Sequence, residues 1–76
     1  MKEMLEALVK GLVDFPDEVS VNEVPGDKFT TLELKVNKDD MGKIIGRQGR
    51  IIKSIRTLMK AYATKENKRL NVEVVE

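Results

Sequence analysis

Two glycines three positions apart, Gly46 and Gly49, flank an Arg47-Gln48 pair near the middle of this chain. Glycine lets the main chain approach a ligand closely and adopt φ values that other residues avoid. If a helix begins directly after these residues, its free backbone N–H groups and positive dipole end favour an anion at the same place, beside Arg50. The chemistry that suits these residues is non-covalent contact with phosphate. A plain helix break, with glycines making the turn, is the alternative.

Residues on both sides of this glycine loop (residues 46–49) indicate how it is held. Apolar pairs, Ile44-Ile45 before it and Ile51-Ile52 after it, suit two short helices that pack on a core. Lys43 and Lys53 lie about one helical turn to either side of the loop. We therefore predict that both lysines hold flanking phosphates.

Two further helical segments follow from hydrophobic periodicity. Apolar residues recur at spacings of three and four over residues 1–13, which predicts an amphipathic helix. It should stop near Asp14, because Pro16 disfavours helical geometry in the preceding residue. The helix after the loop has one apolar stripe and an opposite cationic face. The stripe comprises Ile51, Ile52, Ile55, Leu58, Met59 and Tyr62, and the cations are Arg50, Lys53, Arg56 and Lys60.

The helix before the loop is short, with Met41, Ile44 and Ile45 on one apolar face and Gly46 at its end. Asp39 and Asp40 stand where a helix needs N-capping oxygens. Paired aspartates also suit metal binding or acid catalysis. Because the chain has no histidine or cysteine and no further acids cluster nearby, we predict that the pair caps the helix.

Three segments are typical of β-strands. Residues 19–24 are rich in β-branched side chains, and Pro25-Gly26 at the centre of the following turn predicts a hairpin or a close equivalent. Residues 32–36 and 70–74 alternate apolar and polar side chains, as strands with one buried face do. The predicted order is helix, strand, strand, helix, glycine loop, helix, strand, in an α+β fold.

Residues 41–52, with an apolar pair, Gly-x-x-Gly and a following apolar residue, resemble the signature of KH domains. More closely, nearly all 76 residues are similar to the small bacterial KhpA-type (YlqC-type) RNA-binding proteins. The resemblance implies a type II KH domain formed by residues 1–76, ordered α-β-β-α-α-β. It further implies a three-stranded mixed sheet with the helices packed on one face.

KH domains clamp the backbone of about four nucleotides of single-stranded RNA or DNA with this loop. The resemblance therefore implies that N–H groups around Gly49 and Arg50 point at phosphate oxygens, and that Gly42 and Ile45 contribute to an apolar groove for bases. Ile45 is equally compatible with the buried core. The expected RNA-binding residues are Gly42, Lys43, Ile45, Gly46, Arg47, Gln48, Gly49, Arg50 and Lys53.

Composition limits the remaining function classes. The net charge of +1 combines −5 over residues 1–40, from five cations and ten acids, with +6 over residues 41–76, from nine cations and three acids. Such asymmetry suits a basic surface for a polyanion. The absence of cysteine, of a signal peptide's basic start and of an apolar run near the roughly 20 residues of a membrane span predicts a cytoplasmic protein without membrane contact.

Other functions are less well supported by the sequence. General acid–base catalysis would depend on carboxylates or lysines, and no such constellation is visible, so we expect neither an enzyme nor a cofactor. A KH-like protein-interaction module that does not bind RNA is the alternative to a bacterial post-transcriptional regulator or RNA chaperone. Four nucleotides give a small interface, so we expect a homodimer or a heterodimer with a second KH protein. The contact would use the apolar edge of residues 51–62 or the first helix with Met1 and Met4.

Overall fold

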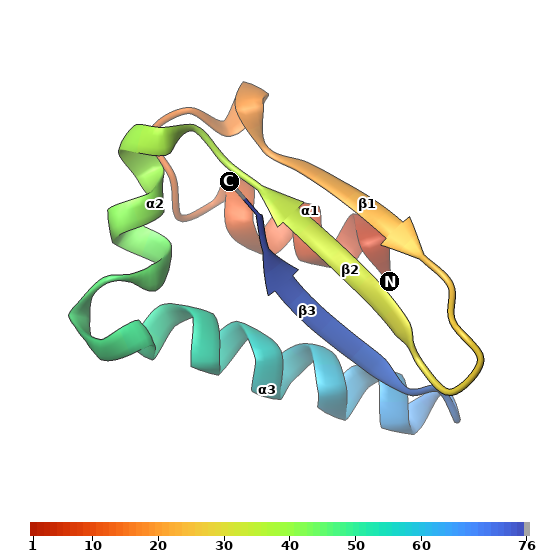
Figure 1. Ribbon diagram of the computed structural model, residues 1–76. Coiled ribbons are helices and arrows are strands. Elements are labelled where there is room, and N and C mark those ends of the chain that lie inside the picture. Colours follow the sequence, from red (N-terminus) through yellow and green to blue (C-terminus); the bar gives the residue numbers. More distant parts are fainter. Residues whose placement is uncertain (76) are drawn as a thin grey trace.

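The computed structural model describes residues 1–75 and confirms the predicted order of elements (Figure 1). The three α-helices are separated by strands and by two short 3-10 turns, η1 and η2. The elements are α1 (Lys2–Lys10), η1 (Pro16–Glu18), β1 (Ser20–Val24), β2 (Thr30–Lys35), α2 (Lys38–Ile45), η2 (Arg47–Gly49), α3 (Arg50–Lys65) and β3 (Leu70–Val74).

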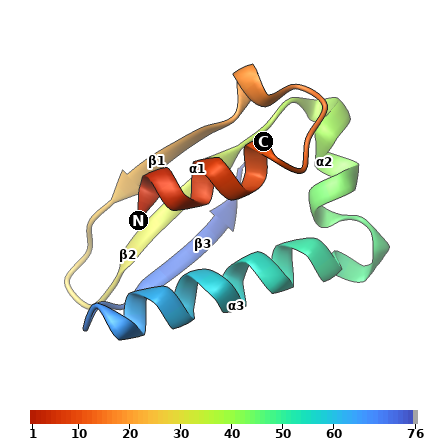
Figure 2. The same cartoon turned by 180° about the vertical axis from the view of Figure 1, so that it is seen from behind.

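The three strands form one mixed sheet in the order β1-β2-β3. β1 runs antiparallel to β2, with Val21 opposite Leu34, and β2 runs parallel to β3, with Leu32 opposite Val72. Helices α1 and α3 lie across the same face of this sheet, as Figure 2 shows from behind, and α2 closes the end of the molecule beyond β2. The α+β architecture with a three-stranded mixed sheet is therefore confirmed.

The core lies between the sheet and the helical layer that α1 and α3 form on one face of it. Alternate strand residues point into it because successive side chains of a strand face opposite sides, and each helix contributes one stripe. The fully buried large side chains include Leu5 and Val9 from α1, Leu32 and Leu34 from β2, Ile44 from α2, Met59 from α3 and Val72 from β3.

The first helix is shorter than the sequence predicts. α1 ends at Lys10, with Gly11 as its C-cap, rather than near Asp14. Glycine is a poor helix former, and the N–H of Leu12 bonds to the carbonyl of Val9 at 2.9 Å in a tighter turn. Leu12 is consequently 45% exposed instead of continuing the buried stripe. Within residues 1–75, no helix is both long and apolar enough to cross a membrane.

Candidate functional site

Gly46 ends α2 and starts the glycine loop. Its N–H donates to the carbonyl of Gly42 at 2.9 Å, which completes the last turn of the helix. A Cβ atom at Gly46 would overlap that same carbonyl oxygen. Gly46 is therefore required by the close approach of two backbone segments, while Gly42 has open space where its Cβ would lie.

The chain reverses direction at two consecutive left-handed residues. Gln48 has φ 62° and Gly49 has φ 70°. The left-handed region costs a residue with a Cβ roughly 1–2 kcal/mol, which explains glycine at the second position. The N–H of Gly49 donates to the carbonyl of Gly46 at 2.9 Å. The expectation that this N–H points at a phosphate is therefore wrong, because the loop itself uses the donor.

The first turn of α3 has unusual electrostatics. Gly49 at the N-cap offers no side chain to accept the helix's free N–H groups, and the first turn contains no acidic residue. Arg50 and Lys53 are both exposed near this end. A cation at the positive end of a helix dipole is unfavourable by about 0.3–1 kcal/mol. An anion placed here would satisfy the free donors and relieve that repulsion.

Gln48 is exposed at the tip of the loop, between the ends of α2 and α3. The backbone of Arg47 lies in η2, and the side chain of Arg47 lies outside the part of the chain that the structure describes.

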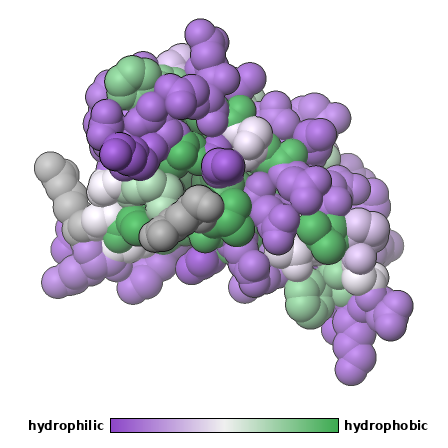
Figure 3. All heavy atoms as spheres, turned by 45° about the horizontal axis from the view of Figure 1, so that its top comes forward, coloured by the Kyte–Doolittle hydropathy of each residue, from purple (hydrophilic) through white to green (hydrophobic). Residues whose placement is uncertain are grey.

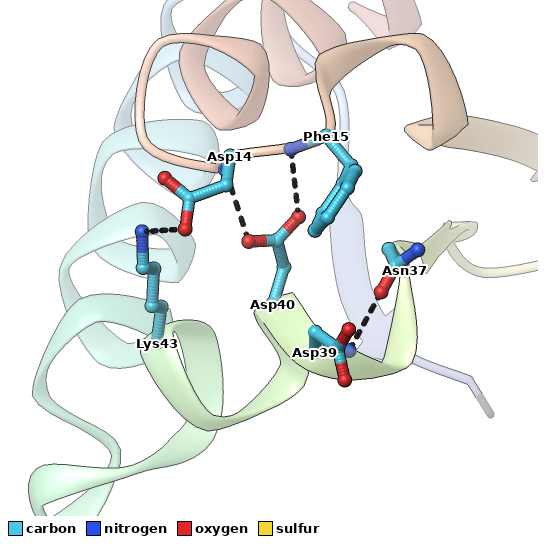
Figure 4. Close-up of polar contacts among 6 residues, drawn as sticks. All are labelled: Asp14, Phe15, Asn37, Asp39, Asp40 and Lys43. Carbon is cyan, nitrogen blue, oxygen red and sulfur yellow. Dashed lines mark hydrogen bonds and ion pairs between the residues drawn. The ribbon is translucent and has the colours of Figure 1, made fainter.

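Lys43, which we expect from the sequence to hold a flanking phosphate, is paired with a carboxylate in the structure. Its Nζ lies 2.7 Å from Oδ2 of Asp14, in the connection between α1 and η1 (Figure 4). The side chains of Lys43 and Asp14 are 45% and 68% exposed. Lys43 is thus already paired with a carboxylate on the α1 side of α2, where it also lines a hollow of about 410 Å³ with Leu12, Gly42 and Ile51.

Asp39 and Asp40 do not cap α2 as the sequence predicts. The N-cap is Asn37, whose Oδ1 accepts the N–H of Asp39 at 2.7 Å. Asp40 is fully buried, and its two carboxylate oxygens accept the N–H groups of Asp14 and Phe15 at 2.9 and 3.0 Å (Figure 4). Asp40 thereby ties α2 to the connection after α1. Asparagine is a preferred N-cap residue, so the sequence carried a signal for Asn37.

An apolar groove runs between α2 and the end of β2. Ile45 is 45% exposed and belongs to this groove rather than to the core. Met41 lies one turn earlier on the same face of α2, and Val36 forms the strand side. The groove encloses about 530 Å³ and has polar residues at its rim, namely Glu18, Lys35, Asn37 and Lys38. Figure 3 shows hydrophobic side chains gathered beside α2 and the end of β2, with hydrophilic ones around them.

Two expectations about neighbouring residues need correction. Gly42 does not share the groove with Ile45, because it lines the separate hollow beside Lys43. Arg56 is not simply part of the solvated face of α3. It is half-buried, and its Nε donates to the carbonyl of Val72 at 3.0 Å. Within residues 1–75, no three His, Cys, Asp or Glu side chains gather as metal ligands.

Comparisons with known proteins found similar sequences over nearly the whole chain. A model of the KH domain of KhpA/KhpB matches residues 2–74. The chain is 60% identical over 75 residues to the RNA-binding protein KhpA of Clostridium acetobutylicum and 57% identical to that of Clostridium perfringens, covering 99% of this chain and 100% of each relative. It is 51% identical to RNA-binding protein KhpA of Borreliella burgdorferi, covering 97% of this chain and 90% of the relative.

One solved structure has a similar fold. The crystal structure of Aquifex aeolicus Era bound to GDP.AlF4- matches with a TM-score of 0.62 and 20% sequence identity. The match covers 96% of this chain and 28% of the Era chain. At this level of identity the likeness concerns the fold alone.

Proposed function

Because the chain belongs to the KhpA/KhpB family of KH domains, we propose that it binds single-stranded RNA by clamping the phosphate backbone on the glycine loop. The observation that carries this proposal is the uncapped start of α3. There, Arg50 and Lys53 are exposed in the first turn of an uncapped helix that contains no acid at this end, next to the exposed tip of the loop. Charge-assisted hydrogen bonds to phosphate are the stronger class of hydrogen bond.

Each expected residue has a definite part in this proposal. Gly46 and Gly49 shape the loop, and Arg47, Gln48 and Arg50 supply side-chain donors, with Lys53 one turn further along α3. The carbonyl of Gly42 holds the N–H of Gly46, so Gly42 supports the loop from α2. Lys43 contributes a flanking cation once its pairing with Asp14 is exchanged for a phosphate.

Bases would lie in the groove beside the loop. Ile45, Met41 and Val36 offer apolar contact there, and the polar rim offers hydrogen-bonding groups. The groove residues include no aromatic side chain, so base recognition would depend on apolar contact and hydrogen bonds rather than on stacking.

The wider role that we propose is that of a bacterial post-transcriptional regulator or RNA chaperone acting in the cytoplasm, with residues 1–76 as one KH domain and without catalytic activity. Relatives with RNA-binding names from several bacteria support this role. A domain that clamps about four nucleotides gains affinity when two loops act together, by roughly 10²–10⁴ through effective concentration.

We place the dimer contact on the helical layer. Met4 on α1 and Leu58 on α3 are 41% and 57% exposed, and α1 and α3 lie side by side (Figure 2). The two helices whose apolar residues the sequence offers as alternatives are therefore neighbours in the fold. A second copy or a second KH protein would cover both.

The double variant Arg47→Asp/Gln48→Asp tests the proposed clamp. Two carboxylates in the loop would repel phosphate, so we expect at least a tenfold loss in affinity for a five-nucleotide single-stranded RNA, about 1.4 kcal/mol. A matched control, Lys2→Asp/Lys10→Gln, changes the net charge by the same −3 on exposed positions of α1. Binding within twofold of the parent, in a double variant shown to be folded by circular dichroism, would contradict the clamp.

A further inference from the structure

The outer face of α3 carries a polar stripe that contains three cations and two threonines. Between Arg50 and Lys65 the helix has no acidic residue. Five of its exposed residues recur at spacings of three and four, which place them on one side of the helix, away from the buried stripe that includes Met59. The residues of this α3 stripe are Arg50, Lys53, Thr57, Lys60 and Thr64.

The stripe leads away from the glycine loop to a hollow at the opposite end of α3. This far-end hollow encloses about 180 Å³ and is lined by Lys60, Thr64, Lys68, Arg69 and Leu70. A second hollow of about 250 Å³ adjoins it and shares Thr64, Lys68 and Arg69. Three cations and a hydroxyl group thus line one open hollow on the surface.

The backbone around the far-end hollow is fixed by hydrogen bonds. Asn67 adopts φ 59°, and the N–H of Lys68 donates to the carbonyl of Ala63 at 2.8 Å, which is a Schellman motif. The carbonyl of Arg69 accepts the N–H of Thr30 at 3.0 Å from the sheet. Lys68 and Arg69 therefore extend from an ordered turn, so a ligand would not have to order the main chain.

The charge of this cluster is not explained by the fold alone. Lys65 in the last turn of α3 complements the helix dipole, but Lys60 lies earlier and Arg69 lies beyond the helix. Within residues 1–75, neither Lys60, Lys68 nor Arg69 is in an ion pair. Like charges gathered around one hollow repel one another, and an anion bound there removes that cost.

We infer that a single RNA strand held at the glycine loop continues along the α3 stripe and places a further phosphate in the far-end hollow. We identify the ligand of the far-end hollow as the same RNA strand, because the α3 stripe begins at Arg50 beside the proposed clamp. A helix of 16 residues is about 24 Å long, and this length corresponds to about seven nucleotides of a stacked strand. The inference rests on the proposed function and extends the contacted RNA from about four nucleotides to about ten.

The test compares two RNA lengths and two pairs of substitutions. The variant Lys60→Gln/Lys68→Gln removes two cations of the far-end hollow, and the control Lys2→Gln/Lys10→Gln removes two exposed cations of α1. Affinity is measured for five- and fifteen-nucleotide single strands of one repeated base by fluorescence anisotropy. We expect the far-end variant to bind the five-nucleotide RNA within twofold of the parent but the fifteen-nucleotide RNA at least fivefold more weakly. Its salt slope on the longer RNA should be shallower by about 0.7, for the one phosphate in the far-end hollow.

The outcomes separate this inference from the proposed function. Equal losses in the far-end variant and the control, or no loss on the longer RNA, overturn the inference and leave the clamp standing. A parent protein that binds neither RNA overturns both. A loss by the far-end variant on duplex RNA alone, with single strands unaffected, also contradicts the single-strand path.

Discussion

Lys43 of α2 and Asp14, which follows α1, form an ion pair with 2.7 Å between Nζ and Oδ2. The pair has two consequences for the proposed clamp. It holds a cation one turn from Gly46 in a fixed direction, and it places a carboxylate where an incoming phosphate would have to compete.

Asp14→Asn should therefore strengthen RNA binding. The substitution frees Lys43 and removes a negative charge, and the energy of an exposed ion pair, up to about 1 kcal/mol, corresponds to an affinity gain of up to about fivefold. The free energy of unfolding should change by less than about 1 kcal/mol for the same reason. Asp17→Asn is the control, because Asp17 is also exposed and lies in η1. Equal gains in the two variants would show that only net charge matters.

Asp40→Ala should destabilise the protein markedly. The buried carboxylate accepts two backbone N–H groups, and its loss leaves both donors without that partner. Hydrogen bonds to charged groups are worth about 1.5–3 kcal/mol each, so urea denaturation should show a loss of about 3 kcal/mol or more. The neighbouring Asp39→Asn should cost less than about 1 kcal/mol. Similar losses of stability in the two variants would contradict the inference that Asp40 ties α2 to the connection after α1.

The three glycines around the loop should respond differently to alanine. Gly46→Ala should be the most damaging, because its Cβ would overlap the carbonyl of Gly42. Gly49→Ala should cost about 1–2 kcal/mol, because φ is 70° there. Gly42→Ala should gain up to about 1 kcal/mol, since it lies within α2 with open space around it. Thermal unfolding of the three variants gives the order, and a mild effect at Gly46 would mean that the loop can shift.

Salt dependence reports how many phosphates the clamp contacts. For a five-nucleotide single strand with two to four neutralised phosphates, log K against log salt concentration should have a slope of about −1.4 to −2.8. A flat response, or tighter binding to duplex RNA than to a single strand of equal length, is incompatible with the clamp.

Leu58→Glu should weaken self-association or association with a second KH protein. A charge at the most exposed large apolar residue of the helical layer would have to be buried in the proposed contact. Sedimentation at tens of micromolar protein, alone and with a second KH protein, measures the effect. Thr57→Glu, one position away on the α3 stripe, is the control. A parent that stays monomeric in both measurements would refute the dimer.

Local sequence patterns were sufficient to predict most of the fold. The apolar stripe of α3, the alternation in β2 and β3 and the glycine loop each depend on spacings of a few residues, and the structure contains all three. Leu58 is the exception on α3, because it is 57% exposed instead of belonging to the buried face that its spacing predicts. The predicted end of α1 lies too far along the chain, because apolar periodicity continues to Val13 although the helix ends with Gly11 as its C-cap.

The site was harder to predict, because its details depend on contacts between distant residues. Asp40 bonds to the N–H of Asp14, 26 positions earlier, and no local pattern distinguishes such a buried acid from an N-cap. From the sequence alone Lys43 is a free cation, because only the folded chain brings the carboxylate of Asp14 beside it. Ile45 could be placed in the groove only once β2 and α2 were in position.

The hydrogen bond from Arg56 to the carbonyl of Val72 affects one edge of the sheet. Arg69 and Val75 bond to β2 through their backbones, so alternation along β3 turns the carbonyl of Val72 toward the open edge of the sheet. An unpaired edge is a template for adding strands from other chains, which leads to aggregation. Arg56 occupies one acceptor of this edge and places a cation on it. A fourth strand would have to displace that guanidinium group, so the residue protects the β3 edge of the sheet against uncontrolled assembly.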